Sequence, residues 1–287
     1  MKKVKWIIDK DIFEDYEERL VTAIKNSGQE VVFFDDSKHD TKIEHFLANK
    51  FNPEEDIIIF HGSLQHGRGV NRSPFYPGIY LTLENYECFK YYGYFGTDLL
   101  NSHYRMMGLN EVLRNKDDMF YAFGTDAVFI RPSNGYKSFP GQMLPKVNFD
   151  FEFNVLMKSY GGMIDPDTLA VLSPARVIEE EYRFIVVDGV VVSGALYMDR
   201  KSRNDWKAYY DRPCEDQGAF DFAVDMSKIY QPDRAYTIDV CKLTDGRYKL
   251  IELNSFCCAS MYGNDYDKVV KAVNELCISD FYDVVGK

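Results

Sequence analysis

The segment from Tyr236 to Phe256 carries two carboxylates and an amide at a spacing that could bind a metal ion. Asp245-Gly246 lies between two apolar-rich runs, a pattern that favours a hairpin with a two-residue turn. Counting outward from that turn places Asp239 directly opposite Glu252. Side chains alternate along a strand, so Asn254 lies on the same face as Glu252. Opposed carboxylates repel each other unless a cation lies between them. The hairpin therefore predicts a site of hard oxygen ligands, which suits Mg²⁺.

An ordinary hairpin can also carry one acid on each strand, and salt bridges or water would then satisfy both acids. Val240, Ile251 and Leu253 predict that these two strands are buried. A buried carboxylate is costly unless it is paired or bound to a metal. Burial therefore favours a metal site, and the salt-bridge alternative stays open at this point.

A second hairpin is predicted over Glu179–Tyr197, with Asp188-Gly189 as its two-residue turn. Its register places Glu181 and Arg183 on an otherwise apolar face. The apolar members of that face would be Ile185, Val187, Val192 and Leu196. Two charges on such a face either pair with each other or face a ligand. Arg200 would continue the face if the strand extended that far.

A third set of residues could bind phosphate. The predicted strand Ala127–Pro132 ends in Arg131-Pro132, and a loop with glycines and Lys137 follows. A guanidinium offers a fixed fork for two phosphate oxygens, and a loop lysine can close over a third as a point charge. Each residue also has an ordinary interpretation, because such an arginine can form a surface salt bridge and such a lysine can be solvated.

In chain order these motifs resemble the ATP-grasp superfamily. FIRPSNGYKSFPG resembles its phosphate-binding strand and flexible loop, EEEYRF its ribose-binding strand, and Asp239 with Glu252-x-Asn254 its metal ligands. The resemblance covers roughly residues 110–260. Arg131 stands where most relatives have lysine, and this variant is most similar to the R2K clade, found in bacteria and phages.

The resemblance implies an ATP-grasp fold of mixed α/β and α+β type. Residues 1–112 would form an N-terminal α/β domain. Residues 113–287 would form the catalytic module, with a lid-like part at 113–175 and a metal-binding part at 176–287. The implied ligands are ATP and one or two Mg²⁺ ions, with Mn²⁺ as a substitute.

The resemblance also implies a role for each site residue. Asp239, Glu252 and Asn254 would bind the metal, and Arg131 and Lys137 the phosphates. Glu181 would bind the ribose, and the backbone of Val171, Leu172 and Ser173 would contact adenine. Arg183, Arg200 and Lys137 would act at the reacting groups.

The implied activity is ATP-dependent ligation of a carboxylate to an amine through an acylphosphate. The carboxylate could belong to a small molecule, a peptide or a protein. A kinase with a non-carboxylate acceptor and a catalytically silent nucleotide-binding module are the alternatives. We expect the acceptor pocket to involve residues 61–78 and 86–94.

Composition restricts the function further. The chain has 287 residues and a formal net charge of −11, which argues against general binding of duplex nucleic acid. Its start, MKKVKWIID, predicts a first strand rather than a signal peptide, and no run approaches the length of a membrane-spanning helix. The six cysteines show no CxxC pair and are interpreted as reduced thiols. We therefore expect a cytoplasmic location, in a bacterium or a phage-infected cell.

Several further elements are predicted from pattern. Strands are expected at Val4–Asp9, Glu30–Asp35, Asp56–Phe60, Tyr80–Leu83 and Leu169–Leu172, and helices at Asp11–Asn26 and Phe151–Tyr160. Residues 85–113 are expected to be mostly helical, with breaks near Gly93–Gly96 and Gly108. The strand–helix–strand order at the start predicts parallel strands. The glycine- and proline-rich segment 61–78 is expected to be a loop, where His61 and His66 have no third metal ligand nearby.

Overall fold

The structure is a computed structural model that describes residues 2–10, 12–37, 42–159, 164–202 and 212–285. The chain forms two compact units. Unit 1 combines Met1–Thr82 with Glu179–Lys287, and unit 2 is Leu83–Ile178. The predicted boundary at residue 112 falls inside helix α5 (Leu109–Phe123) of unit 2.

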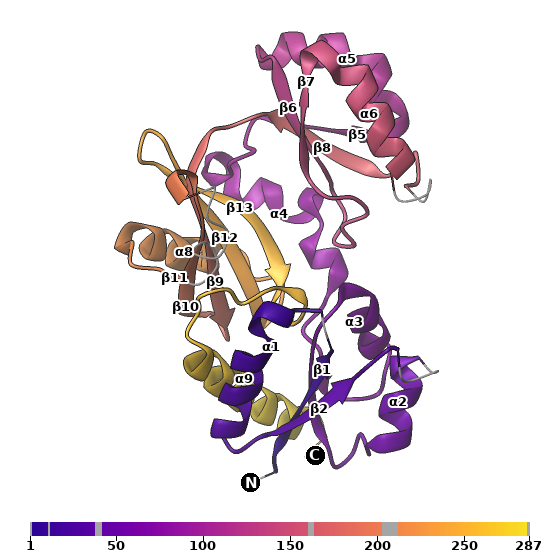
Figure 1. The fold of residues 1–287 in the computed structure, drawn as a ribbon, viewed down its shortest axis with the longest axis vertical. Helices are drawn as coiled ribbons and strands as arrows, with labels where there is room; N and C mark the ends of the chain where they lie inside the picture. Colours follow the sequence, from indigo (N-terminus) through magenta and orange to yellow (C-terminus); the bar gives the residue numbers. More distant parts are fainter. Residues whose placement is uncertain (1, 11, 38–41, 160–163, 203–211, 286–287) are drawn as a thin grey trace. The chain divides into compact units, whose positions relative to one another are not determined.

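Unit 1 begins with a parallel sheet of order β2-β1-β3-β4 (Figure 1). Its strands are β1 (Val4–Asp9), β2 (Glu30–Phe34), β3 (Ile57–His61) and β4 (Pro77–Gly78). Helices α1 (Glu14–Asn26) and α9 (Tyr266–Val284) pack on one side, and α2 (Ile43–Lys50) and α3 (Leu64–Asn71) lie on the other. The parallel arrangement predicted for the first three strands is confirmed.

Helices α2 and α3 were not expected from the sequence. Helix α3 lies inside the segment predicted as a loop, and Ser63 caps its start by accepting a hydrogen bond from the backbone N–H of His66 at 3.2 Å. Glycines at 67 and 69 hide the helix in the sequence because glycine has low helix propensity. Both glycines are buried, and a Cβ at Gly67 would come within 2.9 Å of Ile79. The tertiary packing therefore overrides the local propensity.

The second sheet of unit 1 is antiparallel, with order β11-β10-β9-β12-β13. Its strands are β9 (Ile178–Val187), β10 (Val190–Asp199), β11 (Arg212–Pro213), β12 (Ala235–Leu243) and β13 (Tyr248–Ser255). Helix α8 (Gln217–Ile229) packs on this sheet. Its N-cap, Asp216, accepts hydrogen bonds from Ala219 N (3.2 Å), Lys242 (2.7 Å) and Tyr248 (2.7 Å). Burial opposes ionisation, but these bonds lower the pKa of Asp216 to about 2.

The hairpin of β12 and β13 keeps the predicted pairing of Asp239 with Glu252, but it reaches that pairing differently. The predicted two-residue turn is wrong. Leu243 N donates to Arg247 O at 2.9 Å, so Thr244, Asp245 and Gly246 form a three-residue loop, with Gly246 at φ +82°. That turn shifts the register by one residue. A β-bulge between Asp239 and Val240 shifts it back.

The hairpin of β9 and β10 has the predicted turn, since Val187 pairs with Val190. Asp188 and Gly189 both have positive φ, as a tight hairpin turn requires. The predicted placement of Leu196 beside Glu181 and Arg183 is wrong, because irregularities in β10 move Leu196 opposite Tyr182. The pairing register of β9 and β10 that the turn predicts therefore holds only as far as the first of these irregularities.

Unit 2 contains an antiparallel sheet of order β5-β8-β6-β7 (Figure 1). Its elements are β5 (Arg105–Gly108), α5 (Leu109–Phe123), β6 (Ala127–Pro132), β7 (Gln142–Pro145), α6 (Phe149–Lys158) and β8 (Leu169–Pro174), preceded by α4 (Cys88–Phe95). Short 3₁₀ turns occupy Leu83–Tyr86, Gly96–Asp98 and Lys146–Asn148. The apolar faces of α5 and α6 form one core with the sheet.

The structure differs in two places from the elements predicted over residues 80–113. The strand predicted at Tyr80–Leu83 is absent from this described segment, where the chain instead enters a 3₁₀ turn at Leu83. The predicted breaks near Gly93–Gly96 and Gly108 are confirmed, because α4 ends at Phe95 and α5 begins at Leu109. Strand β5 between the two helices was not expected. Gly96, at φ +51°, ends α4. Across the described residues, we find no helix that combines the length and the apolar character needed to span a membrane.

Candidate metal and nucleotide site

The β12–β13 hairpin of unit 1 brings the three predicted metal ligands together. Asp239 pairs with Glu252 across the two strands. Asn254 donates from Nδ2 to Glu252 Oε1 at 3.1 Å and is 3.3 Å from Asp239 Oδ2. Asp239 and Asn254 are buried, and Glu252 is half-buried. The hairpin therefore presents two carboxylates and an amide as one cluster.

Arg183 completes this cluster from the neighbouring strand β9. Its Nε and Nη2 donate to the two oxygens of Asp239 at 2.8 and 2.7 Å, and its Nη1 donates to Ser260 O at 3.1 Å. This is the bidentate geometry that makes arginine–carboxylate pairs strong. The sequence predicted that the charges on this face would either pair with each other or face a ligand. The structure pairs Arg183 with Asp239 of the neighbouring strand.

Two tyrosine rings lie close to the guanidinium of Arg183. The rings of Tyr197 and Tyr262 stack at 4.8 Å, and the guanidinium lies 5.6 and 5.0 Å from their centroids. Tyr197 also donates to Glu181 Oε2 at 2.7 Å. Burial lowers the pKa of Arg183, but Asp239 outweighs that effect and raises it. Neither tyrosine could be assigned to the site from its sequence position, because the contacts with Arg183 form only in the folded chain.

The donor set fits a divalent cation. Asn254 Oδ1 is buried and has no hydrogen-bond partner among the described residues, so an amide oxygen is left for a ligand. Each carboxylate oxygen has two lone pairs, so Asp239 can hold Arg183 and still coordinate. The described residues contain no group of three His, Cys, Asp or Glu side chains that could hold a metal. The candidate metal ligands are therefore the carboxylates of Asp239 and Glu252 and the amide oxygen of Asn254.

Arg200 does not join this cluster. Strand β10 ends at Asp199, and Arg200 begins a 3₁₀ turn at Arg200–Ser202. Its Nη1 pairs with Glu179 Oε1 at 2.7 Å, and half of its side chain is exposed. The strand stops one residue before Arg200, so the condition under which Arg200 would continue the apolar face is not met.

In unit 2, Arg131 lies near the end of β6 and pairs with Val171 of β8. Tyr92 of α4 is close enough to feel its charge. Burial raises the pKa of Tyr92, and the positive charge of Arg131 acts in the opposite direction. Arg131 is thus half-buried beside an aromatic helix rather than on an open surface.

The loop between β6 and β7 carries Lys137, which is exposed at a positive φ of 51°. Asn134 and Ser138 hydrogen-bond through their side chains at 2.9 Å beneath it. The loop is not loosely held throughout, because Phe139 is 1% exposed and belongs to the core of unit 2. A Cβ on Gly141 would meet the Phe129 ring at 2.5 Å. Residues 134–138, which include Lys137, form the tip of this loop.

The three residues predicted to contact adenine differ in availability. Val171 and Leu172 pair with both β5 and β6, so their backbone groups already serve the sheet. A backbone hydrogen bond from either residue to adenine would compete with that ladder, and their role stays a prediction. Ser173 lies beyond the last β5 pair, and its hydroxyl donates to Asn101 at 2.9 Å. Its position leaves one backbone edge outside the β5 pairing.

A comparison with known protein families shows to which family this chain belongs. A model of the ATP-grasp domain, R2K clade family 2, matches residues 116–272, which is more than half of the chain. The chain belongs to this ATP-grasp family. The matched segment contains Arg131, Lys137, Arg183 and the whole β12–β13 hairpin. Among curated protein sequences, none matches this one.

Solved structures with the same fold cover nearly the whole chain. D-cycloserine synthetase DcsG has a TM-score of 0.62 at 11% identity, covering 96% of this chain and 99% of its own. D-alanine–D-alanine ligase from Bacillus anthracis has a TM-score of 0.60 at 12% identity, covering 100% and 99%. The ATP-grasp ligase PsnB, solved with a minimal precursor, Mg and ADP, has a TM-score of 0.56 at 10% identity, covering 97% of each chain. At these identities the similarity establishes the ATP-grasp fold.

Proposed function

We propose that this protein is an ATP- and Mg²⁺-dependent ligase that joins a carboxylate to an amine through an acylphosphate. The observation that carries the proposal is the cluster of Asp239, Glu252 and Asn254 beside Arg183. A set of hard oxygen ligands next to a buried guanidinium suits a metal–phosphate complex. The similarity to structures of ligases and synthetases, one of them solved with Mg and ADP, supports the same class.

In this reaction a substrate carboxylate oxygen attacks the γ-phosphorus of ATP, and ADP leaves. An amine then attacks the acyl carbon, and phosphate leaves as the amide forms. Asp239, Glu252 and Asn254 would hold Mg²⁺, which would supply positive charge to offset the charge of the phosphates. The remaining contribution of the protein is positioning and electrostatic stabilisation.

Four side chains serve the nucleotide. Arg131 and Lys137 bind phosphate oxygens, and Glu181, oriented by Tyr197, binds the ribose. The segment that begins at Ser173 contacts adenine through its backbone. Arg183 is shared between Asp239 and the transferred phosphoryl group, which a guanidinium can serve through separate N–H donors. We assign no role to Arg200, which pairs with Glu179.

The proposal is tested by incubating the protein with ATP, Mg²⁺ and pools of amino acids, peptides or lysate, followed by mass spectrometry of the products. Hydroxylamine added to the same mixture should convert an acylphosphate to a hydroxamate. ADP with a hydroxamate supports the ligase. ADP with a phosphorylated alcohol or amine would indicate a kinase instead. Nucleotide binding without turnover in any pool would indicate a silent module.

A further inference from the structure

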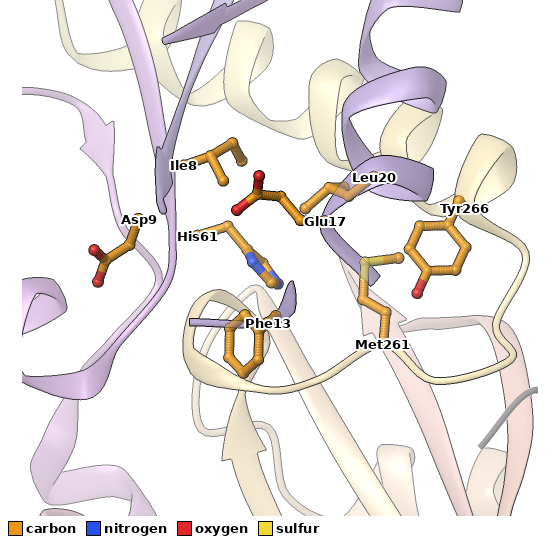
Figure 2. A pocket seen from close by; sticks show the side chains of 8 residues that line it. All are labelled: Ile8, Asp9, Phe13, Glu17, Leu20, His61, Met261 and Tyr266. Carbon is orange, nitrogen blue, oxygen red and sulfur yellow. The ribbon is translucent and has the colours of Figure 1, made fainter. Parts of the chain in front are cut away.

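Several buried polar atoms of unit 1 have no hydrogen-bond partner among the described residues, and they differ in their surroundings. One of them, His61 Nε2, belongs to a residue that lines a small cavity together with apolar side chains such as Phe13, Leu20 and Met261 (Figure 2). The cavity measures about 10 Å³. A water molecule needs about that much space, so a single buried water would satisfy His61 Nε2.

Thr237 Oγ1 and Asn254 Oδ1 are a different case, because their residues face each other across strands β12 and β13. Both atoms are buried without a hydrogen-bond partner within the described ranges. Thr237 and Asn254 are 1% and 6% exposed, and they pair directly in the ladder. Cross-strand partners have Cβ atoms about 5 Å apart. An unpaired hydroxyl and an unpaired amide oxygen therefore lie near each other on one face of the hairpin.

This pair adjoins the candidate metal ligands. Asp239 and Glu252 form the pair two positions further along the strands, and side chains two positions apart point to the same face. One half of this array thus holds two carboxylates, and the other half holds a hydroxyl and an amide. A valine at position 237 would have the same shape as threonine and would leave no buried hydroxyl unpaired, so the retention of the hydroxyl calls for an explanation.

The orientation of the Asn254 amide supplies that explanation. Its Nδ2 lies 3.1 Å from Glu252 Oε1 and 3.3 Å from Asp239 Oδ2, so its Oδ1 points away from the two carboxylates. Ionised carboxylates only accept hydrogen bonds, and an N–H is therefore the favourable end of the amide to place beside them. With a divalent cation between the carboxylates the preference reverses, because Oδ1 would be attracted to the cation and the N–H repelled. The amide must then turn by half a rotation about its Cβ–Cγ bond.

That turn exchanges the two ends of the amide. Asn254 Nδ2 then lies on the side where Oδ1 lies now, and a buried N–H needs an acceptor there. Thr237 Oγ1 is a buried oxygen of the directly facing residue, and its capacity to accept is not used by any described residue. A hydroxyl oxygen accepts hydrogen bonds through its lone pairs, so Thr237 can receive the amide in its turned orientation.

We infer that Thr237 is a positioning residue for the metal site. Its hydroxyl accepts a hydrogen bond from Asn254 Nδ2 when the amide turns its oxygen towards a divalent cation. The inference rests on the proposed function and adds to it a residue that acts through Asn254. It explains why the hairpin keeps a hydroxyl that destabilises it when no cation is bound.

The test compares Thr237→Val, which keeps the shape of the side chain and removes the hydroxyl, with Thr237→Ser, which keeps the hydroxyl. Calorimetry of the full chain measures the affinity for ADP in MnCl₂ and in EDTA. Thr237→Val should weaken ADP binding in MnCl₂ about tenfold, the effect of losing one hydrogen bond, and leave ADP binding in EDTA unchanged. Thr237→Ser should keep the wild-type affinity in both solutions.

Urea unfolding gives a second readout, with the opposite sign. Without metal and nucleotide, Thr237→Val should unfold at a higher urea concentration than the wild type, because it removes an unpaired buried hydroxyl. Tyr236→Phe is the matched control. The Tyr236 hydroxyl is also buried without a partner in the described part of the chain, but the side chain points to the other face of β12. This control should gain stability in the same way and keep the wild-type affinity for ADP in MnCl₂.

The turn of the amide has a signature of its own. In the isotopically labelled wild type, the nuclear Overhauser effect between the Asn254 side-chain amide protons and the Thr237 methyl group should strengthen when MgCl₂ and ADP are added together. An effect that does not change would overturn the inference. So would a Thr237→Val protein that binds ADP in MnCl₂ as tightly as the wild type, or equal losses of affinity in Thr237→Val and Tyr236→Phe.

The proposed function fails in a different way. Glu252→Gln removes a candidate metal ligand and should abolish the dependence of ADP affinity on MnCl₂, whatever residue stands at position 237. A wild type whose ADP affinity is the same in MnCl₂ and in EDTA would contradict the metal site, and the role of Thr237 with it. A wild type that depends on MnCl₂ beside an equally dependent Thr237→Val would contradict the role of Thr237 alone.

Discussion

Asp239→Asn and Glu252→Gln each remove one negative charge from the candidate metal cluster, yet the structure predicts very different effects on stability. Asp239 accepts from Arg183 at 2.8 and 2.7 Å, and the two side chains are 2% and 9% exposed. Removing one partner of a buried ion pair costs about 3–5 kcal/mol. The replacing asparagine keeps one acceptor oxygen, so we expect a loss near the lower value, about 3 kcal/mol. Glu252 is half-buried and accepts from the neutral amide of Asn254, so its loss should cost about 1 kcal/mol.

Urea unfolding followed by circular dichroism measures both free energies of unfolding. The double variant Arg183→Gln/Asp239→Asn closes the cycle, and it should be less destabilised than the sum of its single variants because neither charge is then left unpaired. Glu252→Gln should stay folded and lose Mg²⁺-dependent ATP turnover by orders of magnitude. Equal destabilisation by Asp239→Asn and Glu252→Gln would refute the argument, as would strict additivity of Arg183→Gln and Asp239→Asn.

Three further outcomes are expected. Arg131→Ala should weaken ATP binding by about 1.5–3 kcal/mol, the contribution of a charge-assisted hydrogen bond, and leave adenosine binding unchanged in calorimetry. An equal loss of affinity for both ligands would show that the role of Arg131 is structural. A non-hydrolysable ATP analogue should slow hydrogen exchange at residues 134–138 in the wild type but not in Lys137→Ala, whereas Phe139 should be protected with and without nucleotide. If hydrogen exchange at residues 134–138 of the wild type did not change with nucleotide, Lys137 would not belong to the phosphate site. Asp216→Asn should cost about 1–2 kcal/mol at neutral pH, allowing for screening by solvent. Because the folded-state pKa of Asp216 is lowered, this stability is fully present above about pH 5 and disappears as pH falls from about 4 towards 2. The free energies of unfolding of wild type and variant should therefore converge in acid. A difference that persists at low pH would contradict the ion-pair explanation.

The chemistry of the site was readable from local sequence. The pattern Asp239, Glu252-x-Asn254 depends on strand alternation and on a hairpin turn, and both are short-range properties. The pairing of Asp239 with Glu252 was predicted correctly although the turn was not, because the three-residue loop and the β-bulge offset each other. The parallel start of the chain was equally local, since its strands and first helix carry clear apolar periodicity.

Other features depend on contacts between residues far apart in the chain. Arg183 meets Asp239 only because β9 and β12 are neighbours in the sheet, an order that no local pattern encodes. Helix α3 forms despite its glycines because it packs closely against α2 and against residues that follow β4 and β13. The backbones of Val171 and Leu172 are engaged in the sheet because β8 is paired on both sides.

Residue types and their spacing along the chain thus determined which groups can bind a metal and phosphates in this protein. The tertiary structure decided which of those groups are paired and which keep an unsatisfied atom. Asn254 Oδ1 and His61 Nε2 are the clearest cases, because a buried polar atom without a partner arises from the packing of several elements around it. No single segment of the sequence contains that information.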